Sequence, residues 1–189
     1  REYFHMKNPL DKIDAIKFDV KPREYLTKEE FKTYVRYLQR INDLRGLAYV
    51  MLTYSSACRI SEILGLNRDS LDYRLKRFKV LGKGQKYRYC IFSEEAGEVV
   101  KKYLATRKDN NPALFYSRNR QRWAKESVER FVRNSVKAAG IMKKITPHCL
   151  RHTRAMHLLE DGVSLYEIQK ILGHSNIAST QIYAKMSLE

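Results

Sequence analysis

The residues best suited to chemistry lie near the end of the chain. His148 and Arg151 are three positions apart, His174 directly follows a glycine, and Tyr183 comes nine residues later. The Thr-Pro pair at 146–147 is typical of a helix start, with a hydroxyl cap and a proline at the first helical position. His148 and Arg151 should therefore share one helix face. This combination indicates a clamp for an anion beside a nucleophile.

A tyrosine nucleophile needs help from its surroundings. Its hydroxyl has a pKa near ~10, so it is scarcely ionised at neutral pH unless cations or a base assist it. The alternative is structural, because thirteen tyrosines and five histidines leave room for coincidence, and such side chains are more often packed or exposed than catalytic. These residues alone leave both interpretations open.

Three further candidates lie upstream. Arg59 and Glu62 are three apart between apolar neighbours, so both should be partly buried and paired or bound to an anion. From residue 71 to 92 the pattern changes to period two around a Gly-Lys-Gly turn, which predicts a β-hairpin with Lys83 at its tip. The alternative for Lys83 is an exposed side chain that touches a phosphate or only water.

Helical signals dominate the segments that must position these residues. Capping residues and apolar stripes recur at helical spacing. Residues 1–25 have two prolines and no long period, which suits a linker or a strap lying on a domain. The predicted helices run from Thr27 to about Arg40, from Asn42, from Ser93, through Val128 to Gly140, from Thr146 to Asp161, from Ser164 to Gly173, and from Ser175 to near Tyr183.

The composition points to a nucleic-acid partner. The 189 residues carry a net charge of +16, from 37 basic and 21 acidic residues, which favours binding to a polyanion. The sequence contains no apolar run long enough to span a bilayer and no secretory signal pattern, so we expect a cytoplasmic protein. The three cysteines lack metal-ligand spacing. They are expected to be reduced core residues, and no zinc site is predicted.

Basic residues concentrate in the hairpin and in residues 101–144. The second region interleaves lysine and arginine with Tyr116 and Trp123, as expected of a surface that follows a phosphate backbone. Charge runs are more often solvated faces, but the charge excess of the whole chain favours binding. The predicted DNA-binding residues are Lys86, Arg88, Arg118, Arg120 and Arg122.

Five motifs stand in a recognisable order. They are an Ala-x-Arg-x-Ser-Glu segment around Arg59, the hairpin Lys83, the His148-x-x-Arg151 pair, a Gly-His step at 173–174, and Tyr183. In this order and spacing, residues 26–189 resemble the catalytic domain of tyrosine site-specific recombinases, in particular the Xer and phage-type integrases. The resemblance implies an α+β, mainly α-helical fold, with a small three-stranded antiparallel sheet that carries the lysine hairpin. Residues 1–25 would then be a linker or strap from a missing N-terminal DNA-binding domain.

The resemblance also implies a role for each candidate residue. Tyr183 would attack the scissile phosphate and become a 3′-phosphotyrosine. Lys83 would protonate the leaving 5′-hydroxyl as general acid, and Glu62 would brace the site. The remaining four would contact the phosphate, Arg59 and Arg151 at its non-bridging oxygens, and His148 and His174 through hydrogen bonds that also manage the tyrosine proton.

The implied substrate is double-stranded DNA with a specific recombination site, for integration, excision, or resolution of chromosome or plasmid dimers. No metal and no cofactor is expected, because protein cations supply the positive charge. The full-length protein should form a homotetramer on synapsed DNA near the nucleoid of a prokaryotic cell, whereas this fragment can be monomeric. It lacks the helical domain that clasps the other DNA face and ends six residues after Tyr183.

Two rival functions remain open. Residues 164–183 also match a helix-turn-helix with Gly173 in the turn, which would make a non-catalytic DNA-binding protein. That interpretation gives no role to Arg59, Lys83 or the His148-Arg151 pair. A type IB topoisomerase shares the chemistry, although the compact motif spacing favours a recombinase.

Overall fold

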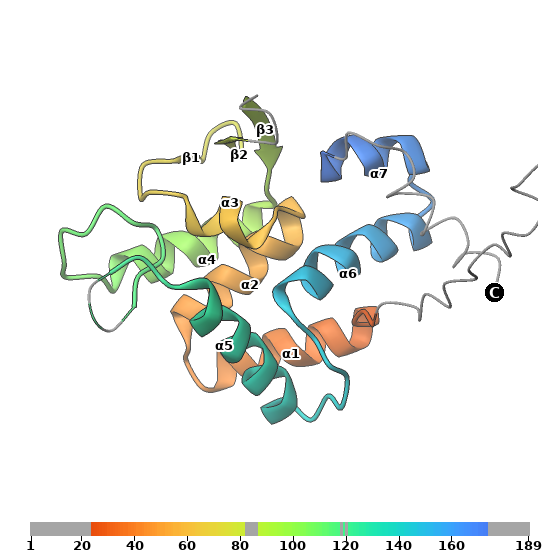
Figure 1. Ribbon diagram of the computed structural model, residues 1–189, viewed down its shortest axis with the longest axis horizontal. Coiled ribbons are helices and arrows are strands. Elements are labelled where there is room, and N and C mark those ends of the chain that lie inside the picture. Colours follow the sequence, from red (N-terminus) through yellow and green to blue (C-terminus); the bar gives the residue numbers. More distant parts are fainter. Residues whose placement is uncertain (1–23, 82–86, 118, 120, 174–189) are drawn as a thin grey trace, which may run out of the picture.

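The computed structural model describes residues 24–81, 87–117, 119 and 121–173. Helices make up most of this part, and a small sheet lies at one end of the helical body (Figure 1). The predictions for Lys83, Lys86, Arg118, Arg120, His174 and Tyr183, and for a last helix from Ser175, fall outside the described residues. The elements are α1 (Lys28–Arg40), α2 (Leu44–Ser56), α3 (Ile60–Leu64), β1 (Leu71–Asp72), β2 (Arg77–Leu81), β3 (Tyr87–Ile91), α4 (Glu94–Ala105), α5 (Lys125–Ala138), α6 (Pro147–Glu160) and α7 (Leu165–Leu172).

Most predicted helix starts are confirmed by their cap hydrogen bonds. Thr27 and Ser164 each form a capping box with the glutamate three residues later, and Ser93 accepts from the Ala96 amide. Pro147 opens α6 after the Thr146 cap. These bonds satisfy amides that would otherwise lack partners at each helix start.

The predicted cap of the second helix was wrong by one residue. Asp43, not Asn42, caps α2, and its Oδ1 accepts from the Gly46 amide at 2.9 Å. Asn42 instead adopts a left-handed conformation with φ of 53°, which asparagine tolerates better than most residues. The turn between α1 and α2 therefore uses Asn42 to reverse the chain before the cap.

The sheet confirms the predicted three-stranded antiparallel arrangement, including the two strands of the predicted hairpin. Its order is β1-β2-β3, all antiparallel, and Lys79 pairs with Tyr89 and Leu81 with Tyr87. Alternate residues of β3 therefore face opposite sides. Tyr87, Tyr89 and Ile91 are exposed, and Cys90 is buried.

Helix α2 forms the centre of the core. Its residues from Leu47 to Val50 are all buried, and it packs against α1, α4 and α6. A Cβ added at Gly46 would lie 2.3 Å from Cζ of Phe131, so the glycine allows α5 to approach α2 closely. A second apolar cluster, which includes Ala155, Met156, Ile168 and Leu172, joins α7 to α6.

The three cysteines are free, as predicted, but only two belong to the core. Cys58 and Cys90 are buried, whereas Cys149 is half-buried at the first turn of α6. In the part of the chain that the structure describes, no helix is long and apolar enough to cross a membrane.

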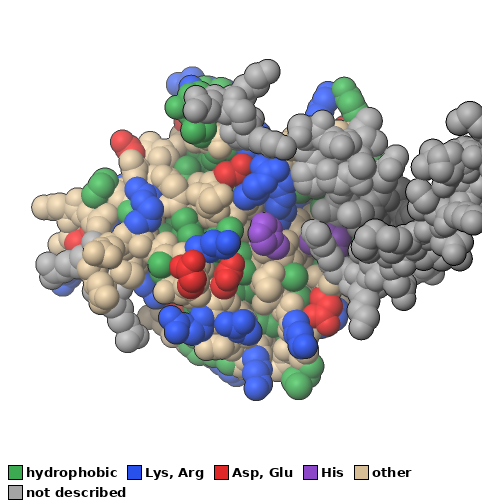
Figure 2. All heavy atoms as spheres, viewed as in Figure 1, with side chains coloured by type: hydrophobic (Ala, Val, Ile, Leu, Met, Phe, Trp, Pro, Cys, Tyr) green, Lys and Arg blue, Asp and Glu red, His purple; other side chains and the backbone are tan. Residues whose placement is uncertain are grey.

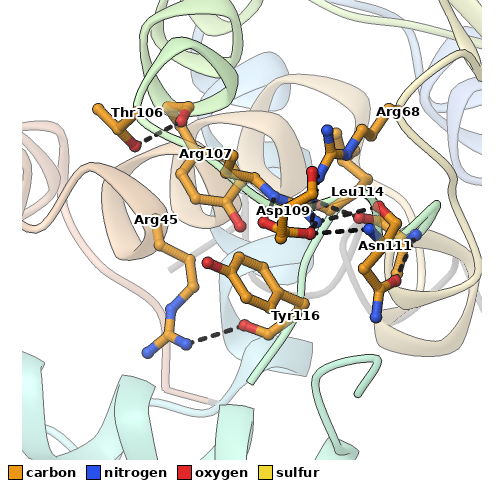
Figure 3. A network of polar contacts seen from close by, with 10 residues as sticks. Arg45, Arg68, Thr106, Arg107, Asp109, Asn111, Leu114 and Tyr116 are labelled. Atoms are coloured by element: carbon orange, nitrogen blue, oxygen red, sulfur yellow. Dashed lines mark hydrogen bonds and ion pairs between the residues drawn. The ribbon is translucent and has the colours of Figure 1, made fainter. Parts of the chain in front are cut away.

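Arg107 organises the long connection between α4 and α5 (Figure 3). Its side chain is 1% exposed and donates to both carboxylate oxygens of Asp109, at 2.6 and 3.0 Å. It also donates to the carbonyls of Asn111, Ala113 and Leu114. The Arg107 bonds hold the pKa of Asp109 well below its usual range. This carboxylate therefore stabilises the fold at neutral pH, and that contribution is lost as the pH falls below its unfolded-state pKa.

We expect Arg107→Met to destabilise the protein by about 2–3 kcal/mol, because it leaves three carbonyls without their donor and removes one of the two arginine partners of Asp109. Denaturant unfolding of both proteins measures this difference. The matched control is Arg68→Met, because Arg68 also binds Asp109 at 2.7 Å but is 32% exposed, so its loss should cost less. A cost of about 1 kcal/mol or less for Arg107→Met, the range of exposed ion pairs, would contradict this role.

Candidate active site

The candidate residues meet where four helix ends lie close together, namely the C-termini of α2 and α7 and the N-termini of α3 and α6. Arg59 is the N-cap of α3 and comes two residues after Ala57, which ends α2 in a left-handed conformation with φ of 50°. Glu62 lies on α3, and Arg151 lies in the second turn of α6. Figure 2 shows basic, acidic and histidine side chains gathered on one face, over the region between α3 and α6 of Figure 1. The tertiary fold thus brings together residues that are about ninety positions apart.

Arg151 ties two helix ends together from inside the protein. Its residue is 6% exposed. Nη1 donates to the Ala57 carbonyl at 2.7 Å, and Nη2 donates to the Leu172 carbonyl at 2.6 Å. Both carbonyls lie at helix C-termini, where the helix dipole favours a cation. Arg151 therefore fixes the backbone just before Gly173.

Burial lowers the pKa of Arg151 to about 10, and the nearby positive charge of Arg59 adds to this effect. The guanidinium remains charged at neutral pH because that value is still well above 7. A buried cation with a second cation beside it is stabilised by an anion, since the local field is positive.

Glu62 is the acidic centre of the cluster. Its side chain is 6% exposed and accepts from the Arg59 amide at 2.7 Å and from Arg59 Nη1 at 3.1 Å. It also accepts from Arg88 Nη1 at 2.9 Å and from Arg88 Nη2 at 3.1 Å. The Arg59 side chain remains 37% exposed. The predicted partly buried pair of Arg59 and Glu62 is therefore present.

The cluster carries more positive than negative charge. Arg59, Arg88 and Arg151 surround the single carboxylate of Glu62. His148 is exposed in the first turn of α6, one turn from Arg151. Guanidinium groups bind phosphate oxygens in pairs and never lose their charge at neutral pH. The arrangement is suited to hold a phosphate group at the surface beside α6.

The comparison with known proteins agrees with this geometry. The Phage integrase family matches residues 24–189. The chain belongs to this family. It is 41% identical over 155 residues to the tyrosine recombinase XerC of Thermodesulfovibrio yellowstonii, covering 77% of this chain and 51% of that protein. It is also 30% identical over 195 residues to the tyrosine recombinase XerD of Staphylococcus aureus, covering 99% of this chain and 66% of that protein.

Solved structures give the same fold for this phage integrase domain. The XerA recombinase superposes with a TM-score of 0.79 at 35% identity, over 86% of this chain and 59% of that one. The XerH recombinase bound to its palindromic difH substrate has a TM-score of 0.79 at 20% identity, over 98% of this chain and 56% of that one. The predicted fold class and resemblance are confirmed. The chain spans about half to two thirds of the length of these relatives.

Two arginines of this integrase domain that we predicted to bind DNA have internal partners. Arg88 points inward onto Glu62 and is 21% exposed. Arg122 is exposed, but its Nη1 donates at 2.7 Å to the carbonyls of both Leu64 and Leu66. Their guanidinium groups therefore support α3 and the connection that follows it, a role that charge density alone did not indicate.

The inward direction of Arg88 could have been read from the sequence. Alternation in β3 places residue 88 on the same side as Cys90, opposite Tyr87 and Tyr89. An arginine on the buried side of a strand requires an acceptor, such as a carboxylate or a carbonyl oxygen. What the sequence does not show is that this partner is Glu62.

One buried histidine of the integrase domain is structural. His157 is 1% exposed, and its ring nitrogens lie 2.8 Å from the Tyr54 hydroxyl and 2.8 Å from the Leu26 carbonyl. Burial lowers its pKa. Among the described residues, no three His, Cys, Asp or Glu side chains lie close enough together to hold a metal ion.

Proposed function

We propose that residues 26–189 are the catalytic domain of a site-specific recombinase that cleaves and rejoins DNA strands through a 3′-phosphotyrosine. The observation that carries the proposal is the cluster of Arg59, Glu62, Arg88 and Arg151, with its excess positive charge near the N-terminus of α6. The similarity to recombinases named XerC and XerD supports it. So does the sequence beyond α7, which continues with His174 and Tyr183.

In the proposed reaction, the Tyr183 oxygen attacks the phosphorus atom and the bond to the 5′ oxygen breaks. Arg59 and Arg151 stabilise the charge that develops on the non-bridging oxygens. His148 and His174 bind the phosphate and accept the tyrosine proton, and Lys83 gives a proton to the leaving 5′ oxygen. A 5′-hydroxyl from another strand then attacks the phosphotyrosine, which restores the phosphodiester and frees Tyr183. Glu62 orients Arg59 throughout.

The test is the capture of a covalent intermediate. Duplexes with a randomised sequence and a nick near the cleavage position are incubated with the 189-residue chain and denatured. DNA that remains linked to protein is then sequenced. Loss of the short fragment past the nick prevents rejoining, so a cleaving enzyme accumulates the adduct. DNA binding without any adduct would instead support a non-catalytic binding protein.

The proposed substrate predicts a steep salt dependence that involves α5. This helix packs against α3 and α6, and Arg130 and Arg133 are exposed on it. Replacing both with glutamine should weaken DNA binding and reduce the slope of log affinity against log salt by about 0.9 for each phosphate that the variant no longer neutralises. The matched control replaces Lys101 and Lys102, exposed on α4, which packs mainly against α2. Equal slopes for both double variants, measured by fluorescence anisotropy, would contradict a role for α5.

For the whole protein, we propose a homotetramer on two synapsed DNA duplexes, because strand exchange joins four strand ends. Residues 26–189 are expected to hold the cleavage chemistry of one protomer.

A further inference from the structure

We infer that Arg88 is a positioning residue that neutralises Glu62 and thereby keeps Arg59 free to bind a phosphate. The inference rests on the proposed function for the identity of that phosphate. It replaces our prediction that Arg88 itself contacts DNA.

Glu62 divides its hydrogen bonds unequally between two arginine side chains. Arg88 donates to both carboxylate oxygens, at 2.9 and 3.1 Å. The Arg59 side chain makes one bond to the same carboxylate, from Nη1 at 3.1 Å. A bidentate arginine is the stronger partner. Arg88 therefore occupies the face of the carboxylate that Arg59 would otherwise take.

The net charge around Glu62 also depends on Arg88. Glu62 is 6% exposed, so water screens its charge poorly. Without Arg88, Glu62 on α3 and Arg59 at its N-cap would form an ion pair of zero net charge. Arg59 would then be held by the carboxylate and would stabilise a phosphate less. With Arg88 present, the three residues carry one net positive charge, and Arg59 keeps a side chain that is 37% exposed.

Arg88 also lies directly against Gly173. A Cβ added at Gly173 would lie 2.5 Å from Arg88 Nε and 3.1 Å from Cζ, and Gly173 has φ of 63°. The Arg88 side chain therefore packs directly on the glycine backbone. Because Arg151 holds the preceding Leu172 carbonyl, two arginines support the chain immediately before His174.

Two simpler roles must be separated from this one. Arg88 could be an ion pair that only stabilises the fold, or it could contact a DNA phosphate. A structural ion pair would change the unfolding temperature without changing the cleavage rate at saturating DNA. A phosphate contact would change the DNA affinity and its salt slope.

The experiment is a double-mutant cycle of Arg88→Met and Glu62→Gln, because methionine keeps the contact with Gly173 but has no charge. Single-turnover adduct formation is measured at saturating DNA, together with affinity and unfolding temperature. Arg88→Met alone should reduce the rate by about 100-fold, as expected when a catalytic group is displaced, with nearly unchanged affinity. In the Glu62→Gln background the same change should cost only about threefold, because the charge that Arg88 neutralises is gone.

The comparison of Glu62→Gln with the double variant remains decisive even where Arg88→Met alone does not fold, since the double variant contains no unpaired buried charge. A loss of about 100-fold in that comparison would overturn the inference, because it would show that Arg88 does not act through Glu62. A matching loss of DNA affinity would make Arg88 a DNA contact instead.

A second measurement needs no catalytic activity. Phenylglyoxal modifies accessible guanidinium groups, and peptide mass spectrometry gives the reaction rate of Arg59. Arg88→Met should slow the modification of Arg59, and the double variant should restore it. One outcome is that the wild-type chain forms no adduct while the modification of Arg59 still slows in Arg88→Met and recovers in the double variant. In that case the proposed function fails and the positioning role stands. Unchanged reactivity of Arg59 toward phenylglyoxal in all variants would overturn the positioning role, whether or not the chain forms an adduct.

Discussion

Tyr183→Phe is expected to abolish the covalent protein–DNA adduct while leaving DNA affinity nearly unchanged. The phenolic oxygen is the atom proposed to form the bond to phosphorus, so the proposed reaction cannot occur without it. One hydroxyl contributes little to binding that is dominated by contacts to many phosphates. Denaturing gels of the nicked duplex measure the adduct, and fluorescence anisotropy measures the affinity.

The control for this prediction is Tyr166→Phe. Tyr166 is on α7, 65% exposed, and the Lys170 ammonium lies 4.3 Å from its ring centroid. An exposed tyrosine beside a cation is a competing candidate for the nucleophile. Because the proposed nucleophile is Tyr183, the Tyr166 variant should keep full adduct formation. An adduct that survives in Tyr183→Phe and disappears in Tyr166→Phe would transfer the nucleophile to α7.

Lys83→Ala is expected to reduce cleavage of ordinary DNA by about 100-fold to 10,000-fold, the usual contribution of a general acid. An alkoxide is a poor leaving group at neutral pH, so the 5′ oxygen needs a proton as its bond to phosphorus breaks. DNA with sulfur at the 5′-bridging position should restore the rate of the variant, because a thiolate leaves without a proton. Single-turnover rates on the two substrates test this.

The control for the sulfur rescue is Arg59→Met. Arg59 is proposed to act on the non-bridging oxygens, which the sulfur substitution leaves unchanged, so its defect should persist on both substrates. Arg151 is less suitable, because its removal would also leave the Ala57 and Leu172 carbonyls without their donor. Equal defects of Lys83→Ala on oxygen and sulfur substrates would make Lys83 a binding residue. His148 and Lys86 would then be the next candidates for the acid.

Features that depend on neighbouring residues could be predicted from the amino-acid sequence. Capping boxes at Thr27 and Ser164, the proline start of α6 and the period-two hairpin were all predicted, because each signal lies within a few positions of the chain. Helix α3 was missed, since five residues are too few to show a helical period. The order of the five motifs was sufficient to predict the family and the fold class.

Which charges face one another depends on how the chain folds in three dimensions. Arg151 binds carbonyls 94 and 21 positions away, and Arg88 binds Glu62 across 26 positions. Such pairs leave no local pattern, because they depend on how helix ends and strands pack around α2. Charge density placed Arg88 and Arg122 among the DNA contacts, whereas the fold gives Arg88 the Glu62 carboxylate and gives Arg122 backbone carbonyls as internal partners. A desolvated guanidinium is strongly favoured to bind the nearest anion or carbonyl oxygen, and folding, not composition, decides which one is near.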